Sequence, residues 1–419
     1  MTTTPHVLIS GGGIAGLALA LGLVRDGVRT TVVERAPAPR PGGQAVDLRG
    51  ASREVAERLG LLPEILRHRI DERGLAYVDG RGRVYGRMSM EDFDGEGAVA
   101  EIEIARGDLN RVLLDALAAA DAAAPGLLDL RYGEHLTALV QDADGVDATF
   151  ASGAAERFDL VVGADGVHSA TRRLAFGPED RFATRLGGCT AFFTLPRPAD
   201  LEPGWFAMRS VPGATFGLRP GADPATAMAL ITLRIDHDAS LRGDRDAQEA
   251  RIRSALAGAG WHAPTALAAM STATDFYFDE LVRIDVPVPA VGRVALVGDA
   301  AASGSPLTGM GTATALVSAH LLARRIASAP EDLPGALARY AVDLAPFAAA
   351  GKAIPGGSIR FFVVGSRLGQ AMSRLTTGLM LSRALRPLVQ RLFRAGRGAE
   401  PTLPDPAPPT SARPAARAA

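Results

Sequence analysis

The residues with the clearest chemical meaning are three glycines near the start of the chain. Gly11, Gly13 and Gly16 lie between the apolar runs 7–9 and 17–24, in the spacing G-x-G-x-x-G. In a strand-to-helix turn, the first glycine permits the tight turn, the second allows a pyrophosphate to approach, and the third lets helix and strand pack closely. The pattern predicts a dinucleotide whose phosphates lie at the helix N-terminus, beside Ile14 and Ala15.

A second predicted strand supports this interpretation. Residues 30–33, two threonines and two valines, are predicted to form a short strand that ends in Glu34, 18 residues beyond Gly16. A carboxylate at this place accepts hydrogen bonds from ribose hydroxyls, and Arg35 follows it directly. The alternative is a glycine-rich turn beside a surface glutamate. FAD and NAD both satisfy the fingerprint, so these residues alone leave the dinucleotide open.

Two later stretches, 159–173 and 292–323, each place a buried-strand pattern before a glycine and an aspartate. The first continues in D-G-x-x-S-x-x-R spacing, with Ser169 and Arg172. Ligands bind at the carboxyl ends of strands in α/β folds, so both stretches are candidate binding loops. Their candidate residues are Asp165, Gly166, Gly298 and Asp299.

Taken in order, these three motifs resemble those of the FAD-dependent monooxygenases of the para-hydroxybenzoate hydroxylase fold. These single-component aromatic hydroxylases include tetracycline-modifying and polyketide-tailoring oxygenases. The resemblance extends to about Phe393. It implies an α/β protein: a GR2-like Rossmann FAD-binding domain, an antiparallel β-sheet substrate domain and C-terminal helices. It also implies that NADPH or NADH reduces FAD, and that a flavin C4a-hydroperoxide passes one oxygen atom of O₂ to an aromatic, phenolic or polyketide-type small molecule.

The resemblance also assigns roles to particular residues. Asp299 would bond a ribityl or ribose hydroxyl, while Asp165 and Gly166 would lie near the pyrophosphate and shape the approach of the nicotinamide. Arg106, before a predicted helix, would contact the flavin. Gln44, Asp47 and Arg49 belong to a glycine-containing segment, 40–60, that would run along the flavin ring; a plain surface loop is the alternative. The stretch SPLTGMG would present amides to the flavin, with Pro306, Gly309, Met310 and Gly311 as its residues.

A helix predicted at about 312–327 would direct its positive end toward the same loop. Such amides would stabilise the negative charge of a reduced flavin. Two positions depart from the family: Ala302 stands where histidine is common, and Ser318 stands where aspartate is common.

The spread of the motifs predicts a discontinuous FAD-binding domain over 1–72, 100–175 and 285–350. Residues 73–99 and 176–284, with alternating and β-branched patterns, would form the substrate-binding sheet. Residues 351–395 would form basic amphipathic helices packed across both domains, with a membrane contact as the alternative. The Pro/Ala-rich stretch 396–419 would be a disordered tail.

Composition restricts the partners. Lys plus Arg is 45 and Asp plus Glu is 46, so the net charge of −1 gives no global attraction for nucleic acid. No uncharged apolar run is long enough to cross a bilayer. The single Cys189, expected to be a buried core thiol, fits a reducing cytoplasm. No zinc-spaced Cys/His cluster is present, and a monomer or homodimer is expected.

The sequence identifies no catalytic base. Residue type alone suggests His237, His262 and Tyr277 as bases, and Arg209, Arg219 and Arg234 as partners for a carboxylate or enolate. Each is more often structural or solvated. Two other functions remain open: a flavin-dependent reductase of the geranylgeranyl-reductase type, and a non-catalytic FAD-binding redox sensor.

Overall fold

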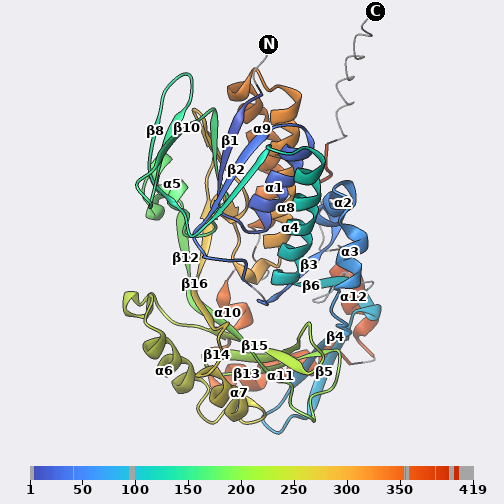
Figure 1. Cartoon of the computed structure of the whole chain (residues 1–419). Coiled ribbons are helices and arrows are strands. Elements are labelled where there is room, and N and C mark those ends of the chain that lie inside the picture. Colours follow the sequence, from blue (N-terminus) through green and yellow to red (C-terminus); the bar gives the residue numbers. More distant parts are fainter. Residues whose placement is uncertain are drawn as a thin grey trace, which may run out of the picture.

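The computed structural model describes residues 4–40, 42–93, 100–352, 354, 358–382, 384–395 and 401–404. Two large sheets dominate it. A mostly parallel sheet and its helices occupy one end of the molecule, and a mixed sheet occupies the other, as Figure 1 shows. The α/β fold with C-terminal helices predicted from the sequence is confirmed.

The first sheet has six strands, and all neighbours except the β17–β18 pair run parallel. In spatial order the strands are β17 (Ala290–Val291), β18 (Val294–Leu296), β11 (Leu160–Gly163), β1 (His6–Ser10), β2 (Arg29–Glu34) and β7 (Leu128–Tyr132). Their side chains alternate between two cores: Val7 and Ile9 face one, Leu8 faces the other, and all three are fully buried. Burial on both faces explains why these strands read as continuous apolar runs.

Helices cover one face of this sheet and a small antiparallel sheet covers the other. The helices are α1 (Ile14–Arg25), α4 (Arg106–Ala123), α8 (Gly311–Ser328) and α9 (Leu333–Gly351), and the small sheet comprises β8 (Leu136–Gln141), β9 (Val146–Phe150) and β10 (Ala155–Phe158). α1 and α8 pack closely: a Cβ on Gly22 would lie 2.8 Å from Cβ of Ala323. Next to them lie α2 (Gly50–Arg58), α3 (Leu62–Arg67) and the pair β3 (Ala45–Leu48) and β6 (Ile102–Ala105).

The second sheet has eight strands. In spatial order they are β19 (Ala302–Ser303), β16 (Tyr277–Asp285), β12 (Ala183–Pro196), β15 (Thr226–Leu233), β14 (Ala214–Pro220), β13 (Trp205–Val211), β4 (Gly74–Val78) and β5 (Val84–Ser89). α6 (Arg245–Ala255) and α7 (Ala263–Met270) contribute to its core. Cys189 is buried in β12, as expected, and burial raises the pKa of its thiol to about 12.

The expected antiparallel sheet is correct except at two places. β4 runs parallel to β13, because it belongs to a separate segment of the chain and is not joined to β13 by a hairpin. β19 pairs antiparallel with β16, but it follows the Gly298-Asp299 motif and so comes from the segment 285–350 that was expected to belong to the FAD-binding domain. The long strands β12 and β16 extend from this sheet toward the first one (Figure 1).

The C-terminal helices are α10 (Ile359–Phe362), α11 (Arg367–Met380) and α12 (Arg386–Ala395), with Pro387 in the first turn of α12. α11 packs beside β5 and β13. The expectation that the apolar surface of this segment is buried is wrong for α11, whose described residues are all at least partly exposed. Within the described residues, no helix is long and apolar enough to cross a membrane.

Only residues 401–404 of the predicted disordered tail, 396–419, are described; the others lie outside the described residues. Leu403 is buried in the core that includes Phe347 of α9. This short part of the tail is therefore packed against the protein.

Candidate functional site

The strand register brings the candidate loops to one edge of the six-stranded sheet. Ser10 at the end of β1 lies opposite Val33 and Gly163, and Gly163 lies opposite Leu296. The loops that follow these parallel strands therefore begin side by side. This is the position at which open α/β sheets bind their ligands.

The glycine turn after β1 is confirmed as a close-packed strand-to-helix junction. Gly11 has φ of +117°, and a Cβ there would lie 2.5 Å from the carbonyl oxygen of Ala164. A Cβ on Gly16 would lie 1.9 Å from the carbonyl oxygen of Gly11. Gly13 is the N-cap of α1 and makes no side-chain cap hydrogen bond among the described residues. The first N–H groups of α1 are thus available to an anion.

Glu34 holds the glycine turn from the end of β2. Its Oε2 accepts a hydrogen bond from the amide of Gly12 at 2.8 Å, and its Oε1 accepts one from the amide of Ala36 at 2.8 Å. Each carboxylate oxygen retains a second lone pair for a ribose hydroxyl. Arg35, the next residue, is exposed.

The Asp165 carboxylate is occupied by its own loop. Its Oδ1 accepts a hydrogen bond from the Ser169 hydroxyl, and its Oδ2 accepts from the amide and hydroxyl of Thr171 at 2.9 and 3.0 Å. Gly166 follows with φ of +79°. The buried Arg172 donates to the Ala300 carbonyl at 3.1 Å, which joins this loop to the loop that contains Asp299.

The Asp299 carboxylate differs from that of Asp165, because one of its oxygens has no partner in the described part of the chain. Its Oδ1 is buried and has no hydrogen-bond partner among the described residues. Burial raises the pKa of this carboxyl above its ordinary value, while the charge of Arg106 and a hydrogen bond from Ser303 oppose the rise. A buried acceptor without a donor costs free energy unless a ligand supplies one.

Ser318, one of the two departures from the family pattern, positions the Asp299 turn. Its hydroxyl oxygen accepts a hydrogen bond from the amide of Gly298 at 2.8 Å, and the hydroxyl donates to the Ala315 carbonyl at 3.2 Å. Gly298 has φ of +58°, and a Cβ there would lie 2.9 Å from Cβ of Ala15. At the other departure, Ala302 lies buried in β19.

The loop between β19 and α8 is tightly turned. Ser305 has φ of +68°, a conformation that residues with a Cβ rarely adopt, and the Ser305 side chain accepts a hydrogen bond from the amide of Leu307 at 3.3 Å. A single 3₁₀ turn covers Pro306–Thr308, and Gly309 has φ of +66°. Met310 is the N-cap of α8, again without a side-chain cap from a described residue. The helix predicted at 312–327 is confirmed as Gly311–Ser328.

Arg106 begins α4 and reaches the same edge. Its guanidinium lies 4.0 Å from the place of a Cβ on Gly13, and its charge acts on Asp299. The amide of Arg106 donates to the Gln44 carbonyl at 3.0 Å, which ties α4 to the 40–60 segment. Asp47 and Arg49 of that segment form an ion pair at 2.5 Å.

The eight-stranded sheet brings Tyr277 toward these residues. Tyr277 on β16 stacks on Phe192 of β12, with ring centroids 4.6 Å apart and planes 3° apart. Burial raises the pKa of Tyr277 above its ordinary value, with Asp279 acting in the same direction; Arg106 opposes the rise and Asp299 adds to it. Tyr277 is therefore near the charged residues of the candidate site.

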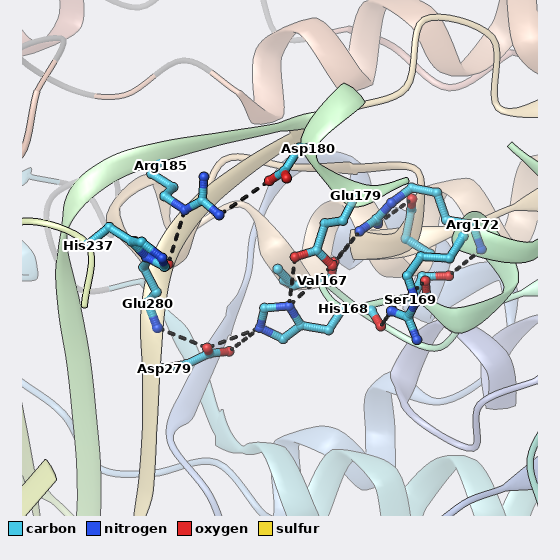
Figure 2. A network of polar contacts seen from close by, with 12 residues as sticks. Val167, His168, Ser169, Arg172, Glu179, Asp180, Arg185, His237, Asp279 and Glu280 are labelled. Carbon is cyan, nitrogen blue, oxygen red and sulfur yellow. Dashed lines mark hydrogen bonds and ion pairs between the residues drawn. The ribbon is translucent and has the colours of Figure 1, made fainter. Parts of the chain in front are cut away.

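A polar network leads away from Tyr277. The Tyr277 hydroxyl donates to Asp279 Oδ2 at 2.9 Å, and His168 Nε2 lies 3.1 Å from Asp279 Oδ1. Figure 2 shows His168 between Asp279 and Glu179, with Arg172 beyond Glu179. The hydrogen bond that His168 makes to Asp279 and the charges of both carboxylates raise the pKa of His168. This network joins the Asp165 loop to strand β16.

The other residues suggested by type alone have local partners. His237 lies 3.0 Å from Glu280, and His262 lies 3.4 Å from Asp200. Arg219 is shared by the buried carboxylates of Glu72 and Glu103, at 2.7 and 2.8 Å. Arg209 donates to the Ala259 carbonyl at 3.3 Å. The guanidinium of Arg234 packs against the backbone of Gly365, where a Cβ would lie 2.6 Å from it.

Three residues of the network, His168, Glu179 and Asp279, were not predicted from the sequence, and neither was the buried side chain of Asn110. His168 lies in the stretch 159–173 and Asn110 lies in the helix predicted after Arg106, but neither residue belongs to a motif that would assign it a role. Asn110 Oδ1 is buried without a hydrogen-bond partner among the described residues. Glu179 lies six residues beyond the stretch 159–173, and Asp279 of β16 is 111 residues from His168, so only the fold brings Asp279 to His168.

The residues at this edge fit FAD. The N-termini of α1 and α8 offer uncapped amides to negatively charged groups, and Glu34 has room for a ribose hydroxyl. Asp299 Oδ1 is an acceptor that awaits a donor such as a ribityl hydroxyl. In the described residues, no cluster of His, Cys, Asp or Glu is arranged to hold a metal ion.

Comparison with known proteins agrees with this geometry. The FAD binding domain family matches residues 4–350. The chain is 38% identical over 340 residues to an uncharacterized protein of Mycobacterium tuberculosis, covering 80% of this chain and 88% of that protein. It is 32% identical over 356 residues to a flavin-dependent monooxygenase of an unknown prokaryotic organism, covering 84% and 89%. The crystal structure of the tetracycline destructase Tet(55) superposes with a TM-score of 0.76 at 30% identity, covering 92% of this chain and 98% of that one.

Proposed function

The chain belongs to the FAD binding domain family and is an FAD-dependent monooxygenase, and we propose that it hydroxylates an aromatic, phenolic or polyketide-type small molecule. In this proposal NADPH or NADH supplies the electrons and docks transiently, without a binding domain of its own. One atom of O₂ enters the substrate and the other leaves as water. We place the reaction in the cytoplasm, in a monomer or homodimer.

The observation that carries the cofactor assignment is the unpartnered Asp299 Oδ1. It is buried beside the uncapped N-terminus of α1, whose residue Ala15 packs against Gly298. We assign Asp299 to a flavin ribityl or ribose hydroxyl and Glu34 to the adenosine ribose. The amides of Gly13, Ile14 and Ala15 are assigned to the pyrophosphate. Asp165 acts indirectly, because its carboxylate builds the loop that presents Gly166.

Bound FAD supplies the redox chemistry with O₂, and the chain supplies position and electrostatics. The uncapped N-terminus of α8, after Gly309 and Met310, is assigned to stabilising negative charge on the reduced flavin ring. Arg106 adds a positive charge that acts on the Asp299 carboxylate. Gln44 and Pro306 are assigned to the walls that enclose the ring.

The substrate side is assigned to the stacked pair Tyr277 and Phe192. A flat aromatic wall favours a planar, electron-rich substrate, because aromatic rings pack well on one another. The raised pKa of Tyr277 keeps its hydroxyl protonated, so Tyr277 positions a substrate oxygen and is not a base. The similarity to the tetracycline destructase Tet(55) supports a substrate with several fused rings.

The decisive experiment supplies the purified holoenzyme with NADPH, ¹⁸O₂ and a panel of phenolic and polyketide compounds. We expect a product heavier by one ¹⁸O atom, and NADPH consumption that depends on that substrate. A product that gains only hydrogen would indicate a reductase. Bound flavin without turnover on any compound would favour a redox sensor.

A further inference from the structure

Helix α11 faces the protein with its polar side. Gln370 Nε2 donates to the Ser210 carbonyl of β13 at 2.6 Å. Arg374 pairs with Asp79 at 3.1 Å, and its guanidinium lies 5.2 Å from the ring centroid of Tyr85. An amphipathic surface helix normally turns its apolar stripe toward the core. In α11 this orientation is reversed.

The apolar side of α11 therefore faces away from the protein. Leu368, Met372, Leu375 and Leu379 are 75%, 54%, 67% and 58% exposed. Their spacing of four, three and four residues places them on one face of the helix. We call these four side chains the α11 stripe. An exposed apolar surface of this kind marks an interaction site.

The helices before and after α11 in the sequence also carry exposed large apolar residues. Phe361 of α10 is 68% exposed, and Leu388 of α12 is 54% exposed. In Figure 1 α11 lies beside the strands of the eight-stranded sheet, at the end of the molecule away from α9. The stripe is thus separate from the edge of the six-stranded sheet that carries the candidate FAD site.

The charge of this segment is strongly one-sided. Residues 359–395 contain no aspartate or glutamate, although the whole chain has a net charge of −1. Their basic residues are Arg360, Arg367, Arg374, Arg383, Arg386, Arg391 and Arg394. Arg360, Arg367 and Arg391 are exposed. The surface around the stripe therefore attracts anions.

Charge distinguishes between the possible binding partners of the α11 stripe. A second copy that docked through the same face would bring the exposed Arg360, Arg367 and Arg391 against the same residues of its partner, and these like charges repel. Residues 405–419 contain two arginines, one aspartate and no large apolar residue, so they match neither the charge nor the stripe. Nucleic acid would satisfy the arginines but would leave four large apolar side chains without a partner.

We propose that α10, α11 and α12 dock the protein on the surface of an anionic lipid bilayer. The α11 stripe enters the boundary between headgroups and acyl chains, while the arginines contact lipid phosphates. Docking of this kind is peripheral and does not require a membrane-spanning helix. It is independent of the proposed reaction.

The test is flotation of the FAD-loaded protein with vesicles of phosphatidylcholine and phosphatidylglycerol, compared with vesicles of phosphatidylcholine alone. We expect binding to the anionic vesicles that weakens as salt is raised, because added ions screen the arginines. Leu375→Glu/Leu379→Glu should weaken this binding by about tenfold or more, since two apolar contacts become repelled charges. Arg367→Gln should weaken it by about fivefold.

Val140→Glu is the matched control, because Val140 on β8 is 67% exposed and lies on a different sheet. It should bind vesicles as the unaltered protein does. FAD content and circular dichroism verify that every variant is folded. The proposal is overturned by equal binding to both vesicle types, by no binding to either, or by equal loss in the Val140 control. It is also overturned if the stripe variant converts a dimer to a monomer in light scattering while vesicle binding is unchanged.

Discussion

Two strand-end turns of the six-stranded sheet share a sequence pattern and differ in their chemistry. Asp165 follows β11 and Asp299 follows β18, and the two strands are neighbours. The Asp165 carboxylate accepts three hydrogen bonds from Ser169 and Thr171. The Asp299 carboxylate retains a buried oxygen without a partner among the described residues.

The difference separates a carboxylate that builds a loop from one that is prepared for a ligand. The Asp165 carboxylate is already hydrogen-bonded within its own loop, so these hydrogen bonds stabilise the folded protein. Burial raises the pKa of Asp299, which means that the folded protein disfavours the charged form of this carboxylate. A glycine and an aspartate after a strand therefore predict a binding edge without showing which carboxylate meets the ligand.

The largest expected effect comes from the glycine turn beneath the Asp165 loop. Gly11→Ala places a Cβ 2.5 Å from the Ala164 carbonyl oxygen at φ of +117°, so the loop must move. We expect a loss of about 2–5 kcal/mol in the free energy of unfolding, from backbone strain and overpacking. Urea denaturation measures it. Gly309→Ala, with φ of +66° and no described atom within 4 Å of the new Cβ, should lose no more than about 1–2 kcal/mol. Equal losses would show that close packing does not govern the turn.

Asp299→Ala tests the ligand-binding side of the comparison. Loss of a charge-assisted hydrogen bond of about 1.5–3 kcal/mol should weaken FAD binding about 10- to 100-fold. Flavin fluorescence titration of the apoprotein gives the dissociation constant. Removing a buried carboxylate with a raised pKa should not lower the stability of the apoprotein at neutral pH. Unchanged FAD affinity would remove Asp299 from the site.

Asp165→Asn tests the loop-building side. The amide retains one acceptor oxygen and turns an NH₂ donor toward hydroxyl and amide donors, so we expect a loss of about 1–3 kcal/mol in the free energy of unfolding. The folded fraction should bind FAD with an affinity close to that of the unaltered protein. The two turns would be equivalent if this variant lost FAD affinity as strongly as Asp299→Ala does.

Much of the candidate FAD-binding edge was predictable, because it rests on local rules. Gly16 is required by a backbone contact within its own turn, Gly11 has a positive φ, and strand ends in a parallel sheet meet at one edge. The start of α8 at Gly311, beside the predicted 312, follows from the same local logic. Ser318 was noted as a departure, but its hydrogen bond to Gly298 became visible only in the fold.

The remainder depended on contacts between distant segments. Asp279 of β16 meets His168 of the Asp165 loop across 111 residues, and no spacing in the sequence encodes that contact. The reversed orientation of α11 was not predictable from the sequence pattern. The periodicity correctly predicted an amphipathic helix, but periodicity does not show which side of a helix faces the protein. Polar anchors such as Asp79 and the Ser210 carbonyl determine that orientation.

The smallest effect concerns the link between the Asp165 loop and β16. His168 has a raised pKa and Asp279 a lowered one, because the two side chains are hydrogen-bonded and oppositely charged; for Asp279 this outweighs the effect of burial. A raised histidine pKa stabilises the fold below 6.5, the ordinary value, and that contribution is lost as pH rises through the shifted pKa. The lowered pKa of Asp279 preserves the charge pair down to pH values below 3.8.

His168→Gln should therefore lower stability most between about pH 4 and pH 6.5, by less than about 1 kcal/mol because the pair is partly exposed. Above the shifted histidine pKa the difference should shrink, since neutral histidine and glutamine are both uncharged hydrogen-bonding groups. Urea denaturation across this pH range measures the difference, and Gly309→Ala serves as the comparison because it changes no titratable group. A stability difference that grew with pH would mean that neutral His168 joins the loop to β16, so the link would be a hydrogen bond and not an ion pair.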